Sequence, residues 1–117
     1  MSDPLVELRD ALRAFTRARE WDRYHTPKNL AMALIVEAAE LAEHFQWLTA
    51  EESRSLGHGA KREKIRDELA DVLIYLVELA DTLEVDLVAA AREKIEKNAL
   101  KYPVDKARGN ALKYDEL

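Results

Sequence analysis

The sequence contains no cysteine, and its 117 residues include only three glycines and three prolines. The lack of cysteine excludes a disulfide framework, a thiolate metal site and a cysteine nucleophile. Few turn residues argue against an all-β sandwich or barrel, which needs many turns. No signal-peptide pattern opens the chain, and the longest nearly apolar stretch, Leu69 to Ala80, is too short to span a bilayer. We therefore expect a single cytoplasmic, helical domain over residues 1–117.

Charge and length narrow the class of protein further. The net charge is −5, with 35% charged and 48% hydrophobic residues. A general nucleic-acid binder is usually basic, so this balance disfavours that class. A chain of this length can bury a core, but four or five thin helices leave apolar faces free for a partner.

Apolar residues recur with helical spacing along most of the chain. The first helix has one apolar face, formed by Leu5, Leu8, Leu12 and Phe15, and Ser2 or Asp3 can cap it. Thr49 to Glu52 has capping-box spacing and can begin a short turn. The residues after Pro103 show no clear periodicity. The sequence predicts an all-α bundle of four to five helices, the longer ones over 27–48, 60–83 and 86–102.

Two of these helices each carry a pair of acidic residues within an apolar segment. Glu37 and Glu40 are three residues apart, as are Glu68 and Asp71, so each pair shares a helix face. Four dry, unpaired carboxylates would be very costly. They must pair with lysine or arginine, face water, or bind a cation.

A solvated acidic stripe is the simplest interpretation, because surface glutamate is common. However, most of the circumference of the 60–83 helix is apolar, which indicates burial on most sides and a specific partner for its acids. All-oxygen ligands suit Mg²⁺ or Mn²⁺ rather than zinc. Zinc at His44 or His58 is disfavoured, because no second ligand lies at a familiar spacing.

The 86–102 helix offers groups that suit a phosphate chain. Lys94, Asn98 and Tyr102 follow at intervals of four and share one face. Each also has an ordinary structural explanation: a solvated end, a helix cap and packing. Trp21 and Trp47 can form an aromatic wall for a base, or simply pack. A Walker-type loop and a readable Ser-His-Asp arrangement are both absent from the sequence.

Taken together, these motifs resemble the all-α nucleoside triphosphate pyrophosphatases, the MazG-like superfamily. The acidic pairs match its carboxylate signature. The segments that resemble its dCTP pyrophosphatase branch are 21–30, 40–47, 71–77, 94–103 and 108–114. The resemblance extends from about Leu8 to Leu117, and the order and spacing of the motifs make it specific.

The resemblance implies Mg²⁺-dependent hydrolysis of a nucleoside triphosphate, dCTP or a modified dCTP, to the monophosphate and pyrophosphate. It also implies a homodimer or dimer of dimers. From the acidic balance and the short apolar stretches, we expect neither nucleic acid nor membrane as partner. The metal ligands it implies are Glu37, Glu40, Glu68 and Asp71. The substrate-binding residues it implies are Trp21, His25, Asn29, Trp47, Lys94, Asn98 and Tyr102.

In the mechanism we expect from these residues, Glu37 or Glu40 orients or deprotonates the attacking water. Lys94 offsets charge on the leaving pyrophosphate. The alternatives are a pyrophosphatase for dUTP or another non-canonical nucleotide, and a non-catalytic acidic interaction module.

The chain departs from the family pattern at two places. Val36 stands where the wider superfamily often has a glutamate. The absence of that glutamate fits the dCTP branch, but it removes one possible metal ligand or base. Leu12 or Arg13 falls where close relatives carry a histidine, so we expect only modest selectivity for dCTP over other pyrimidine nucleotides.

Overall fold

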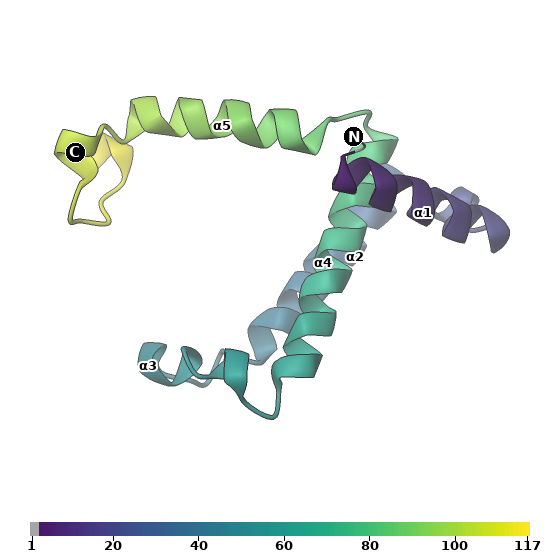
Figure 1. Ribbon diagram of the computed structural model, residues 1–117, viewed down its shortest axis with the longest axis horizontal. Coiled ribbons are helices and arrows are strands. Elements are labelled where there is room, and N and C mark those ends of the chain that lie inside the picture. Colours follow the sequence, from purple (N-terminus) through teal and green to yellow (C-terminus); the bar gives the residue numbers. More distant parts are fainter. Residues whose placement is uncertain (1–2) are drawn as a thin grey trace. The chain divides into compact units, whose positions relative to one another are not determined.

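The computed structural model describes residues 3–117, and these residues form helices and no strand, which confirms the all-α prediction (Figure 1). They divide into two compact units, one reaching to Glu84 and the other comprising Val85–Leu117. None of the described helices is long and apolar enough to cross a membrane. The helices are α1 (Pro4–Ala18), α2 (Pro27–Glu43), α3 (Ala50–Ser53), α4 (Arg62–Thr82), α5 (Leu87–Lys101) and α6 (Val104–Ala107), with 3₁₀ turns η1 (Asp22–Tyr24), η2 (Leu56–His58) and η3 (Tyr114–Glu116).

The helix starts follow the capping residues in the sequence. Asp3 accepts a hydrogen bond from the backbone N–H of Leu5, and Thr26 and Asp86 cap α2 and α5 in the same way. At α3 the side chain of Thr49 accepts from the backbone N–H of Glu52, whose side chain accepts from that of Thr49. This reciprocal pair confirms the capping box.

The predicted end of the second helix at Leu48 is wrong, because α2 ends at Glu43. Beyond it the chain tightens: the N–H of Phe45 bonds the carbonyl of Ala42 at 2.9 Å, three residues back. The physical reason lies at Thr49, which is extended (φ −72°, ψ 163°) so that it can cap α3. Residues 44–48 therefore form turns and a bend rather than a continuation of α2.

In the first unit, α2 lies antiparallel along α4, and α1 packs against α4 (Figure 1). Few side chains are fully removed from solvent, and the buried apolar ones are Leu30, Ile65, Val77 and Ala80. Large apolar side chains remain exposed along both long helices. The small core positions the facing surfaces of α2 and α4, while other apolar surface is left uncovered.

An ion pair fastens α1 to α4. Arg13 donates to both carboxylate oxygens of Asp81, from Nε at 2.8 Å and Nη2 at 2.5 Å. Such bidentate pairs are the stronger kind of charge-assisted hydrogen bond. The guanidinium of Arg13 accordingly lowers the pKa of Asp81 below its ordinary value.

We expect Arg13→Met to lower the melting temperature at pH 7 by roughly 2–5 °C. A carboxyl group whose pKa is lowered on folding contributes stability above its unfolded pKa of about 4 and loses it as the pH falls through the folded pKa. The difference between wild type and variant should therefore shrink as the pH falls below about 4. Thermal melts at pH 7 and pH 3 test this, and an undiminished difference at pH 3 would show that the ion pair is not its source.

Candidate active site

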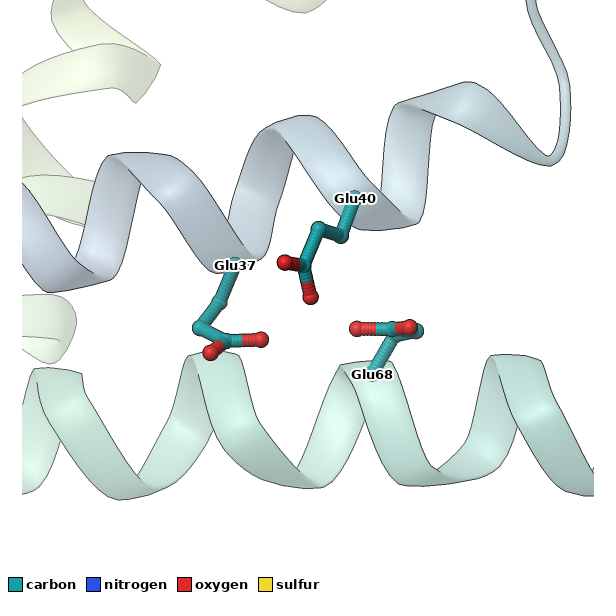
Figure 2. Close-up of side chains that lie close together, drawn as sticks. All are labelled: Glu37, Glu40 and Glu68. Carbon is teal, nitrogen blue, oxygen red and sulfur yellow. The ribbon is translucent and has the colours of Figure 1, made fainter.

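Three carboxylates from two neighbouring helices converge on one space (Figure 2). Glu37 and Glu40 come from α2, and Glu68 comes from α4. One carboxylate oxygen from each lies within 4.8 Å of the others. Because α2 lies along α4, the three-residue spacing of the α2 pair brings both side chains opposite Glu68. Three of the four acids that the sequence pattern singled out therefore lie close together in the structure.

Glu37 is the most perturbed of these acids. Burial raises its pKa, and the neighbouring carboxyl of Glu40 and the charges of Asp71 and Glu68 raise it further. Its Oε2 atom is buried and has no hydrogen-bond partner among the described residues. A buried oxygen without a partner is destabilising unless another group satisfies it.

Asp71 lies one turn beyond Glu68 on α4, outside the group of three. Burial raises the pKa of Tyr75, and the negative charge of Asp71 adds to the upward shifts of both Tyr75 and Glu37. Asp71 therefore borders the carboxylate cluster, and its role as a fourth ligand stays a prediction.

The cluster fits a hard divalent cation. Within residues 3–117, no lysine or arginine forms an ion pair with Glu37, Glu40 or Glu68. The cluster is partly exposed to solvent, but the Oε2 atom of Glu37 is itself buried and has no hydrogen-bond partner among the described residues. A bound divalent cation would satisfy that atom, and Mg²⁺ prefers such oxygen ligands.

His44 caps the end of α2 and approaches the cluster. Its Nε2 lies 3.9 Å from Oε1 of Glu68. His44 follows Glu40 by four residues, which puts both on one side of α2, but this spacing gives no sign of the pairing with Glu68. The contact depends on how α2 and α4 pack, which the spacing within one helix does not show.

His25 and Glu78 form a second pair that sequence reasoning missed. His25 Nδ1 lies 3.4 Å from Oε2 of Glu78, and only 11% of the Glu78 side chain is exposed. Glu78 continues the face of α4 that carries Glu68, Asp71 and Tyr75. That spacing was the available signal, but it did not identify the histidine.

Among the described residues, the rings of the two predicted base-binding tryptophans, Trp21 and Trp47, do not contact each other. Trp21 packs edge-on against Phe15, with ring centroids 5.8 Å apart. Asn29 donates from Nδ2 to the carbonyl of Tyr24 and thus shapes the start of α2. Trp47 lies in the turn after α2 and is 88% exposed. The roles of these residues toward a base stay predictions.

Lys94, Asn98 and Tyr102 belong to the second unit, where α5 carries Lys94 and Asn98 and Tyr102 directly follows its last residue. Tyr102 caps the end of α5, with its N–H bonded to the carbonyl of Asn98 at 2.8 Å. The ring of Tyr114 packs edge-on against Tyr102 with centroids 6.3 Å apart. Tyr114 in the tail thereby supports Tyr102. The roles of Lys94, Asn98 and Tyr102 toward phosphate stay predictions.

Comparisons with known proteins show which family the chain resembles. The model of the MazG-like family matches residues 32–117. dCTP pyrophosphatase 1 of Rattus norvegicus is 42% identical over 97% of this chain and 67% of its own length, and the Homo sapiens protein of that name gives the same values. A crystal structure of a pyrophosphatase from Archaeoglobus fulgidus is similar at a TM-score of 0.82 and 42% identity, covering 88% of this chain and 95% of that one. The resemblance read from the sequence is therefore confirmed, and the chain belongs to the MazG-like family.

Proposed function

We propose that the protein is a Mg²⁺-dependent nucleotide pyrophosphohydrolase that converts dCTP, or a modified dCTP, to the monophosphate and pyrophosphate. The observation that carries the proposal is the convergence of Glu37, Glu40 and Glu68, with an unsatisfied buried oxygen on Glu37. The 42% identity to proteins named dCTP pyrophosphatase 1 supports a nucleotide pyrophosphatase and directs the choice of substrate.

The three acids, together with Asp71, would hold the cation. A bound Mg²⁺ supplies positive charge that offsets the charge on the phosphate oxygens. Glu37 or Glu40 positions the attacking water and accepts its proton, since both carboxylates point into the space between α2 and α4 (Figure 2). The proposal uses direct attack by water, with the carboxylates as cation ligands and proton acceptor.

The remaining predicted residues bind the nucleotide in this proposal. Lys94, Asn98 and Tyr102 present a cation, an amide and a phenol from one side of α5 to the triphosphate. Lys94 stabilises the charge that develops on the leaving pyrophosphate. Residues for the base and its entry come from the first unit: Trp21, His25, Asn29 and Trp47.

The proposal includes assembly into a homodimer or dimer of dimers in the cytoplasm. Apolar side chains at helical spacing stay exposed on α2 (Met32, Ile35, Val36) and on α4 (Leu69, Leu73, Leu76). Exposed apolar stripes of this kind mark interaction surfaces. A second copy of the chain would cover them and exclude water near the acids.

A pyrophosphate-release assay with Mg²⁺ and a panel of nucleoside triphosphates tests the function. We expect turnover of dCTP that chelation of the metal abolishes. In the same assay Lys94→Ala should be slower by roughly tenfold or more, while Lys97→Ala, three residues along α5, should retain activity. Preferred turnover of dUTP would identify the related pyrophosphatase instead, and no turnover of any nucleotide would favour a non-catalytic interaction module.

A further inference from the structure

A pocket of about 190 Å³ opens in the first unit, beside α1 and α4. Its lining includes Leu12, Thr16, His25, Leu30, Glu78 and Asp81. An engineered cavity of roughly 150 Å³ is known to hold benzene, so this pocket has room for one six-membered ring. Its wall combines the apolar side chains of Leu12, Leu30 and Val77 with polar and charged side chains.

Most of the polar side chains of the pocket already have partners. Arg13 and Asp81 bind each other, and the hydroxyl of Thr16 donates to the carbonyl of Leu12 and lies 3.2 Å from Oδ1 of Asp22. The hydroxyl of Thr82 and the guanidinium of Arg9 are also hydrogen-bonded. These contacts fix the wall of the pocket.

Glu78 differs from them. Its Oε2 atom is buried and has no hydrogen-bond partner among the described residues. The 3.4 Å approach of His25 Nδ1 is an electrostatic contact without a hydrogen bond. Burial raises the pKa of Glu78, and the nearby His25 opposes that shift. An incoming N–H donor would satisfy this oxygen.

The pocket lies along the same face of α4 as the carboxylate cluster. Glu78 is two helical turns beyond Asp71, or about 10 Å at 1.5 Å per residue. A nucleotide whose phosphates lie at the cluster can therefore direct its base toward Glu78. Trp21 contributes an aromatic face close by, 6.1 Å from the ring of His25.

We propose that this pocket receives the pyrimidine ring of the substrate and that Glu78 accepts a hydrogen bond from its 4-amino group. The inference rests on the proposed function and deepens it, because it names the group that separates 4-amino from 4-oxo pyrimidines. A carboxylate is an acceptor and pairs with the exocyclic amine of cytosine. The O4 atom of uracil would face it with lone pairs only, leaving two acceptors unsatisfied.

This role changes the expectation of modest selectivity drawn from Leu12. Leu12 lines the pocket without a polar group, as the sequence indicated, but Glu78 supplies one from α4. The pocket therefore has its polar discriminator on a different helix from the one where close relatives carry a histidine. Selectivity for the amino group should depend on Glu78.

The test compares kcat/KM for dCTP and dUTP in wild type, Glu78→Gln and Glu63→Gln. Glutamine keeps the shape but adds an N–H donor, so the dCTP-to-dUTP ratio should fall at least tenfold in Glu78→Gln. Glu63→Gln, an exposed change on the same helix, should keep the wild-type ratio. Melting curves of the three proteins confirm folding.

A second measurement needs only the wild-type protein. The triphosphate of 2-pyrimidinone deoxyriboside lacks the 4-amino group, and its kcat/KM should be at least tenfold below that of dCTP. A wild-type enzyme that hydrolyses dCTP and this analogue equally well, with an unchanged ratio in Glu78→Gln, would overturn the inference and leave the proposed function intact. Failure to release pyrophosphate from any nucleotide would overturn both.

Discussion

Glu40→Gln is expected to slow pyrophosphate release by roughly a hundredfold or more, although it changes little of the shape of the side chain. The carboxylate of Glu40 faces those of Glu37 and Glu68 (Figure 2), and a neutral amide there weakens the hold on a cation. Glu63→Gln, which changes an exposed acid on α4 that pairs with Arg66, is the matched control and should retain activity. Equal activity in both variants would remove Glu40 from the site.

The same variant separates a cation site from a solvated stripe without any substrate. Carboxylates held together repel each other when no cation is present, so metal-free Glu40→Gln should melt at or above metal-free wild type. Mg²⁺ at about 100 times its Kd should stabilise wild type by about 3 kcal/mol, and most of that gain should be lost in the variant. If Mg²⁺ shifts both melts equally, Glu40 is not a ligand.

A charge placed on the exposed apolar stripe of α4 should dissociate the assembly and abolish most of the activity. Leu73 is 41% exposed in the single chain, so Leu73→Lys disturbs its own packing little but would bury a charge in an interface. Leu73→Met keeps the apolar surface and should remain assembled.

Light scattering at micromolar concentration measures the effect. Wild type and Leu73→Met should be at least dimeric, and Leu73→Lys should be monomeric. A wild-type protein that is a stable, fully active monomer would contradict a site completed by a second copy.

Much of the fold follows from local sequence signals. Asp3, Thr26 and Asp86 cap their helices because short polar side chains accept from free backbone N–H groups. The predicted end at Leu48 failed because the apolar pattern continues through residues 44–48 while Thr49 has to leave the helix to cap α3. At residues 44–48 the apolar pattern favours a longer α2, whereas the cap of α3 requires Thr49 to be extended. The cap determines where the helix ends.

The candidate site was likewise predictable from the sequence only in part. The spacing of Glu37 and Glu40 within α2 was enough to place both on one face, and Glu68 joins them because α2 packs along α4. The pairing of His25 with Glu78 could not be predicted, because it joins residues far apart in the sequence. The description of residues 1–117 as a single domain also stays a prediction.

The most direct test of the central claim is phosphorus NMR of the products formed from dCTP with Mg²⁺. The proposed function requires water to attack so that the α–β phosphate bond breaks. The expected products are dCMP and pyrophosphate in equal amounts, and none should form when a chelator removes the metal. Formation of dCDP and inorganic phosphate, or unchanged turnover with chelator present, would contradict a pyrophosphohydrolase built on the carboxylates of Glu37, Glu40 and Glu68.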